Sequence, residues 1–258
     1  MVQTKTTHAS RIVSIAVVLA LAGISAQARA QSDAAGEPAG KQQVLAAIKE
    51  AMAKNQAALK TYTWTETTKI SLKGEVKKQE QNQCQYGPDG KVQKTPIQNA
   101  ADSQPPQQQS GGGGRRGGAV KNAIIEKKVD DMKEYMQKVG ALVHDYVPPD
   151  RQKIQAAQAA GNVSVQPPSS GIATLTIKNY EKQGDAVTLG FDTAAKQLHS
   201  YNVNSYLGND PKDDPVTLAV TFADLPDGTH YAQQTVVNAP AKKIEVDTTN
   251  SDYKKLGQ

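Results

Sequence analysis

The sequence alternates apolar with small or polar side chains through the segment PVTLAVTFAD, residues 215–224. Successive side chains of a strand point to opposite faces, so this segment predicts a strand with one apolar face. That face takes Val216, Leu218, Val220 and Phe222. The same alternation recurs at 187–191 and at 243–247. A sheet with one apolar face needs a cover, which is the chain's own helices, a hydrophobic ligand or a partner protein.

Six strands are predicted in the C-terminal part of the chain. They lie near residues 172–180, 185–192, 196–206, 214–223, 229–238 and 242–249, between turns rich in glycine, proline and aspartate. Because only short turns separate these consecutive strands, neighbouring strands are expected to pair antiparallel. Three more strands are predicted upstream, at 61–73, in the polar segment that ends at Tyr86, and just after the turn Pro88-Asp89-Gly90.

Helical periodicity predicts three helices, at 41–60, 119–146 and 150–160. The second has the clearest pattern, an apolar stripe made of Ile125, Val129, Met132, Met136, Val139, Val143 and Tyr146. Such a stripe either packs on the chain's own sheet or forms a coiled-coil dimer. The predicted fold is α+β: a curved antiparallel sheet of about nine strands, an open or half barrel, covered by two or three helices.

The first 30 residues have the pattern of an export signal. Lys5 and Arg11 precede an apolar run at 12–24, and Ala28-Arg29-Ala30 forms a small-residue cleavage site. We expect cleavage after Ala30, with Ala28 as the alternative, and a periplasmic protein. A retained anchor is the other interpretation, although a run of about 13 residues is short for a bilayer. No comparable apolar run follows, so no transmembrane segment is expected in the mature chain.

The mature chain is predicted to hold a flexible N-terminus at 31–40 and a single domain at 41–258. A Gln/Pro/Gly-rich insertion at 98–118 interrupts that domain and has the composition of a disordered segment. The formal net charge is +5, and loss of the leader would remove three cations and no acid, which leaves +2. A near-neutral domain gives no electrostatic reason to expect a nucleic acid partner.

The residue types that mark catalytic or metal chemistry form no motif in this sequence. His144, His199 and His230 lack the spacing of a zinc site, and the acidic loop 209–215 lacks the pattern of a calcium loop. Cys84 is the only cysteine, so no internal disulfide can form; we expect an unreactive thiol or an intermolecular disulfide. The sequence therefore predicts no cofactor, no metal and no enzyme activity, with a site assembled from distant residues as the alternative.

Seven side chains are candidates to line an apolar interior. Tyr62 and Trp64 begin the first predicted strand on the same face as Ile70 and Leu72. The helical stripe contributes Val129, Met132 and Met136 from the opposite side. Plain core packing is the alternative role for Tyr62 and Trp64.

The order of these elements resembles the periplasmic lipoprotein-carrier (LolA/LolB-like) superfamily. The resemblance lies in an export signal, a helix that ends Leu59-Lys60-Thr61-Tyr62-Thr63-Trp64 and runs into a strand, and hairpins turned by 87–91 and 225–229. It implies an unclosed antiparallel barrel wrapped over helices, with a hydrophobic cavity that takes acyl chains or serves as a sensor domain. The insertion at 98–118 is not part of the carrier pattern.

Two functional hypotheses follow. The first is a non-catalytic exported carrier for a lipidated or otherwise hydrophobic ligand, such as the acyl chains of a lipoprotein or lipid, in an apolar cavity. The alternative is a periplasmic protein-interaction or envelope-sensing module without a cavity, which would bind an envelope protein through a sheet edge or an exposed helical stripe.

Overall fold

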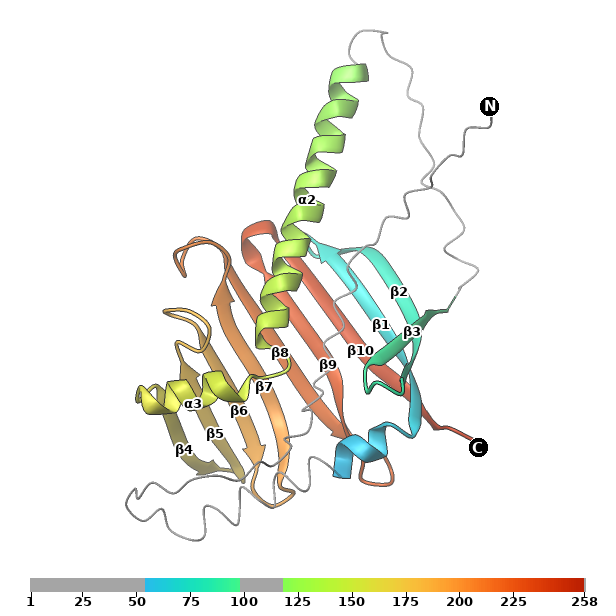
Figure 1. The fold of residues 1–258 in the computed structure, drawn as a ribbon. Coiled ribbons are helices and arrows are strands. Elements are labelled where there is room, and N and C mark those ends of the chain that lie inside the picture. The colour runs from blue at the N-terminus through green and yellow to red at the C-terminus, as the bar shows by residue number, and fades with distance from the viewer. Residues whose placement is uncertain (1–53, 98–117, 258) are drawn as a thin grey trace.

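The structure is a computed structural model that describes residues 54–97 and 118–257. The predicted leader at 1–30, the flexible segment at 31–40, most of the predicted helix at 41–60 and nearly all of the insertion at 98–118 lie outside the described residues. The described residues form one ten-stranded antiparallel sheet with helices on one face (Figure 1). The predicted α+β fold with a curved, open sheet is confirmed.

The strands account for most of the described chain. Their bounds are β1 Tyr62–Leu72, β2 Glu75–Tyr86, β3 Val92–Pro96, β4 Val163–Ser169, β5 Ile172–Lys178, β6 Ala186–Asp192, β7 Gln197–Tyr206, β8 Pro215–Asp224, β9 His230–Ala239 and β10 Ile244–Lys255. The helices are α2 Gly118–Tyr146 and α3 Arg151–Ala159, with a 3-10 turn η1 at Pro240–Lys242 and a short helical segment at 54–59 that precedes β1.

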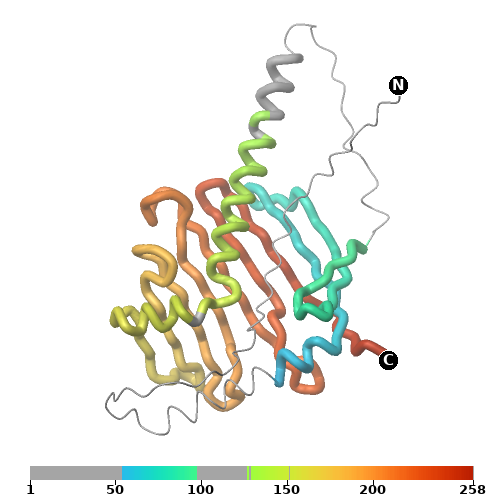
Figure 2. The backbone as a smooth tube through the Cα atoms, viewed as in Figure 1, coloured from blue at the N-terminus to red at the C-terminus, as the bar shows by residue number. Residues whose placement is uncertain are grey.

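The strand order is β3-β2-β1-β10-β9-β8-β7-β6-β5-β4. The chain therefore makes two meanders, β1 to β3 and β4 to β10, and the last strand joins them by pairing with β1 on one side and β9 on the other. The edge strands β3 and β4 lie at opposite ends of the sheet and do not meet, so the sheet stays open (Figure 2).

One apolar row crosses eight of the ten strands in register. It consists of Ile70, Val246, Val237, Leu218, Val203, Val187, Ile177 and Val163. The six central members are between 0% and 3% exposed. Full burial of one such side chain contributes about 1.5–3 kcal/mol, so this row is a main source of stability for the sheet.

Helix α2 covers this apolar row. Val139, Val143 and Tyr146 are buried in the core, and Met132 and Met136 pack against its margin. The C-terminal half of the predicted stripe thus packs on the chain's own sheet. The N-terminal part of α2 extends past the sheet (Figure 1), and Val129 is 48% exposed. The side chain of Ile125, also in the stripe, lies outside the described residues.

A buried carboxylate fixes the end of α2 to the sheet. Asp185 is 2% exposed and its Oδ2 accepts a hydrogen bond of 2.5 Å from the hydroxyl of Tyr146. The same side chain accepts three backbone N–H bonds, from Tyr180 at 2.6 Å and from Glu181 and Lys182 at 2.9 Å. Asp185 therefore closes the turn before β6 and holds the last turn of α2 at once.

Two features of the sheet differ from the sequence prediction. Strand β4 was not predicted, because its sequence VSVQPPS carries two prolines that cannot donate to a ladder; an edge strand tolerates them. Strand β10 continues to Lys255 rather than ending near 249. Its polar second half has no alternation of its own and is held as a strand by its pairing with β1.

Candidate functional site

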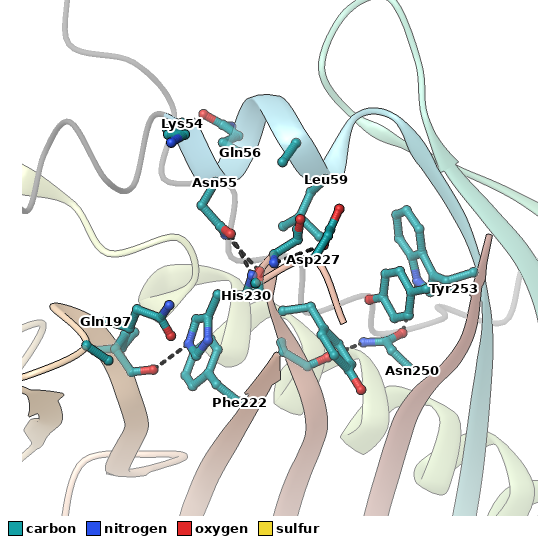
Figure 3. A pocket seen from close by; sticks show the side chains of 18 of the residues that line it. Lys54, Asn55, Gln56, Leu59, Gln197, Phe222, Asp227, His230, Asn250 and Tyr253 are labelled. Atoms are coloured by element: carbon teal, nitrogen blue, oxygen red, sulfur yellow. Dashed lines mark hydrogen bonds between the residues drawn. The ribbon is translucent and has the colours of Figure 1, made fainter. Parts of the chain in front are cut away.

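A cavity of about 430 Å³ lies between the helical segment at 54–59 and one end of the sheet (Figure 3). Its walls come from β1, β2, β7, β8, β9, β10 and the turn between β8 and β9. Trp64 and Glu66 line it, and they share one face of β1 with Ile70 and Leu72, which pack against the core. One face of the sheet is thus packed at one end and hollow at the other.

Three irregularities in strand pairing occur at the hollow end of the sheet. Each inserts an extra residue into one strand: His199 in β7, Gln233 in β9, and one residue of β10 at the left-handed Asp252 (φ 54°). Such bulges bend a strand and increase its twist, and they let consecutive side chains turn toward the same face. The bulge at Gln233 changes the parity of β9, so His230 and Ala232 line the cavity, whereas Thr235 and Val237 are the buried positions on the other side of the bulge.

Asn55 anchors the helical segment to the sheet. Its Oδ1 accepts the backbone N–H of His230 at 2.6 Å, and its Nδ2 donates to the backbone carbonyl of the same residue at 2.7 Å (Figure 3). This pair of bonds mimics the ladder that an additional strand would make at the start of β9. The Asn55 side chain therefore holds the helical segment at 54–59 in place over the cavity.

The His230 ring forms part of the wall beneath that lid. It stacks on Phe222 with centroids 5.2 Å apart and an interplanar angle of 13°. Nε2 lies 2.7 Å from the carbonyl of Leu198, and because a carbonyl only accepts, Nε2 carries a hydrogen. Nδ1 lies 2.7 Å from Oδ1 of Asp224. Both ring nitrogens are used inside the protein.

An aromatic cluster forms the opposite wall. Trp64 stacks on Tyr253 with a centroid distance of 5.6 Å and an angle of 11°, and it meets Tyr86 at 5.4 Å. Tyr231 packs on Tyr253 at 4.5 Å. Burial raises the pKa of Tyr86 to about 12, so its ring stays neutral at ordinary pH. Large rings with neutral hydroxyls give a wall suited to apolar ligands.

Asn250 fixes the orientation of the Trp64 ring. Its Oδ1 accepts the indole N–H of Trp64 at 3.1 Å, and its Nδ2 donates to the carbonyl of Ala232 at 2.9 Å. The indole edge is therefore satisfied within the protein, and its face and remaining edge are left for packing. Trp64 is 5% exposed and is the only tryptophan in the sequence.

The acidic groups around the cavity have cationic partners. The Glu66 side chain is 4% exposed and forms an ion pair with Lys94. Asp227, in the turn between β8 and β9, accepts from the hydroxyl of Tyr62 at 2.5 Å and lies 3.1 Å from Nζ of Lys255. The hydrogen bond from Tyr62, followed by those from Thr229 and Lys255, holds the pKa of Asp227 well below its usual range.

Cys84 lies behind this wall, paired with Trp64 across β1 and β2. It is 0% exposed, and burial, followed by the charge of Glu66, raises the pKa of its thiol to about 12. A neutral, inaccessible thiol is a poor nucleophile.

The seven side chains predicted to line a cavity have different surroundings. Trp64 lines it. Tyr62 is 6% exposed and reaches the cavity margin through Asp227. Ile70, Leu72, Met132 and Met136 pack against the core beneath α2, and Val129 is 48% exposed. The structure does not bring these seven together around one space.

Most of the lining was not proposed from sequence. Phe222 and Leu59 stood on predicted apolar faces, so a signal for them existed. Tyr253 lies beyond the predicted end of the last strand, and Asn55, His230 and Asn250 are polar residues whose role depends on pairing between distant segments. No local pattern identifies such residues.

Within residues 54–97 and 118–257, no group of three His, Cys, Asp or Glu side chains is arranged to hold a metal ion. In the acidic loop, Asp214 accepts a hydrogen bond of 2.7 Å from Tyr135 of α2, and Asp210 accepts from the backbone of Lys212. Among the described helices, none has the length and apolar character to cross a membrane.

Comparison with known proteins gives a distant likeness to a solved structure. No protein-family model matches the chain, and no curated protein matches its sequence. Among solved structures, a DUF1329 family protein from Desulfovibrio piger is similar over 83% of this chain and 94% of its own, with 12% sequence identity and a TM-score of 0.36. At that score the likeness carries no argument about function.

Proposed function

We propose that this protein is a non-catalytic carrier or binding protein that takes the apolar part of a lipidated or otherwise hydrophobic ligand into the cavity under the 54–59 segment. The observation that carries the proposal is the cavity itself, about 430 Å³ in volume and walled by Trp64, Tyr86, Phe222, Tyr231 and Tyr253. Polar side chains lie beside these five rings in the lining, and pockets of this size that combine apolar walls with a set of polar groups are typical of sites for small ligands.

The surroundings of the cavity support binding rather than catalysis. Glu66 is occupied by Lys94, Asp227 by Tyr62 and Lys255, and His230 by Leu198 and Asp224. A general base or nucleophile needs an accessible group poised toward a substrate. In the described part of the chain, the side chains of Glu66, Asp227 and His230 are thus bound to neighbouring protein groups. Together with the predicted export signal, this supports a role as a periplasmic carrier.

Extraction of the purified protein tests the proposal. We expect organic solvent to release a lipid or another apolar compound, and a fluorescent fatty acid to bind and be displaced by it. The variant Ala232→Phe, which fills the cavity, should weaken binding. Ala219→Phe is the matched control, because Ala219 alternates with Leu218 and Val220 and faces the other side of the sheet. Absence of bound lipid together with absence of probe binding would contradict the proposal.

One observation favours the interaction module as a second candidate. The N-terminal part of α2 extends beyond the sheet, and Val129 is 48% exposed there on the apolar stripe (Figure 1). A partner helix could bury this surface. The mass of the protein in solution, compared with that of Val129→Glu, tests it: a change from an assembly to a monomer would support this function, and identical monomeric masses would count against self-association through α2.

A further inference from the structure

The charged side chains at the mouth of the cavity do not balance one another. The inference drawn from them rests on the proposed binding function and specifies its ligand. Every acidic side chain in the wall has a cationic partner: Glu66 has Lys94, and Asp227 has Lys255 at 3.1 Å. These pairs contribute no net charge to the site. A ligand entering the cavity therefore meets no acid without a partner among the lining residues.

Two lysines of the lining lack such a partner. Lys54, in the helical segment, and Lys196, in the turn before β7, are both exposed and both line the cavity. Neither forms an ion pair with any residue in the described parts of the chain. Figure 3 labels Lys54 on the helical segment that covers the cavity. Among the described residues, the rim thus carries two positive charges without an acidic partner, above an interior with five aromatic rings.

We infer that the ligand is an amphiphile with an apolar body and one anionic head, a carboxylate or a phosphate, held at the rim by Lys54 and Lys196. An ionised head would be strongly destabilised inside the aromatic cavity but stays hydrated at the exposed rim. Flexible lysines at that position attract an anion as point charges without requiring one fixed geometry.

A cationic head is the competing chemistry, because aromatic rings attract ammonium groups. Such recognition needs ring faces directed at one centre. Here Trp64 stacks face to face on Tyr253 and packs against Tyr86, so those faces cover one another. The two rim lysines would also repel a cation. The arrangement favours the anion.

Four ligands with the same twelve-carbon chain separate the alternatives: dodecanoate, dodecyl phosphate, dodecanol and dodecyltrimethylammonium. Binding to the purified protein is followed by calorimetry and by Trp64 fluorescence. Dodecanoate, dodecyl phosphate or both should bind more tightly than dodecanol, and the tighter of the two identifies the head group. Added salt should reduce this advantage, since the rim charges are exposed.

The double variant Lys54→Gln/Lys196→Gln tests the two side chains directly. Loss of two exposed charge contacts should weaken binding of the anionic ligands roughly 2- to 30-fold and leave dodecanol unchanged. Lys178→Gln is the matched control, because Lys178 is exposed at the end of β5 and does not line the cavity. Both variants should show the circular dichroism and melting temperature of the unmodified protein.

Two results would overturn the inference. One is tighter binding of the cationic or neutral ligand than of both anions. The other is an unchanged anion affinity in the double variant. Failure of all four ligands to bind, dodecanol included, would instead overturn the proposed function. The two claims can therefore fail separately.

Discussion

Replacing Asp185 with alanine tests whether one buried carboxylate fixes α2 to the sheet. The side chain is 2% exposed and accepts four hydrogen bonds, from the Tyr146 hydroxyl and from the backbone N–H groups of residues 180–182. Alanine would leave the N–H of Tyr180 and the hydroxyl of Tyr146 without this acceptor in a buried region.

The expected cost follows from these contacts. A hydrogen bond to a charged group contributes about 1.5–3 kcal/mol, and disrupting a buried charged network costs about 3–5 kcal/mol because the bonds are not additive. For a domain of this size, that loss lowers the melting temperature by roughly 6–20 °C. Tyr146→Phe removes the hydroxyl with its bonds to Asp185 and to Ser205 Oγ, leaves the three backbone bonds of Asp185 in place, and should cost about 1.5–3 kcal/mol.

Asp192→Ala is the matched control. Asp192 also accepts two backbone N–H bonds, from Ala194 and Ala195 at 2.8 Å, but it does so at an exposed turn. Water can replace those bonds, so the expected cost is below about 1 kcal/mol. Urea unfolding followed by circular dichroism gives the free energies. Equal losses for Asp185→Ala and Asp192→Ala would refute the reasoning that the buried network holds the helix end.

Three further predictions concern other parts of the molecule. Burial raises the pKa of the Cys84 thiol to about 12, so Cys84 should not react with a thiol reagent at pH 8 in the folded protein but should react fully in urea. Rapid labelling of the native protein would contradict the buried position of Cys84. Because the pKa of Asp227 is lower in the folded protein, Asp227 stabilises the fold above the unfolded pKa of about 3.9, and this contribution is lost as the pH falls below it. Urea midpoints should therefore favour the unmodified protein over Asp227→Asn at pH 6 and converge toward pH 2; a gap that widens on acidification would show that the sign is wrong. Finally, Val139→Glu places a charge at a site that is 1% exposed and should cost about 3 kcal/mol or more, whereas Val129→Glu, at 48% exposure, should leave the unfolding free energy nearly unchanged.

The fold could be predicted from sequence largely because burial leaves a period-2 pattern. Val216, Leu218 and Val220 alternate in the sequence and are all buried on one face, and short turns made their neighbours antiparallel. The position of β10 between β1 and β9 had no such signal, since its pairing with β1 joins residues nearly the whole domain apart. Strand β4, with its two prolines, is defined by its place at the edge.

The site was harder to predict for a related physical reason. Bulges at His199, Gln233 and Asp252 shift the alternation, so residues on both parities turn toward the cavity. Trp64 was found because β1 itself carries no extra residue there, so Trp64 keeps the parity of the apolar face even though it lies opposite the bulge in β10. Asn55 was not identified as a site residue, because its role depends on two hydrogen bonds to the backbone of His230, which is 175 residues away.

Trp64 offers the most direct measurement of the central claim, that the cavity binds an apolar ligand. It is the only tryptophan, and it lines the cavity in a fixed orientation set by Asn250. Titration with dodecanoate and dodecanol below their aggregation limits should shift its emission along a saturable one-site curve, and Ala232→Phe should weaken that response while Ala219→Phe does not. An emission spectrum that stays unchanged with both ligands, in protein whose organic extract also holds no lipid, would contradict the account.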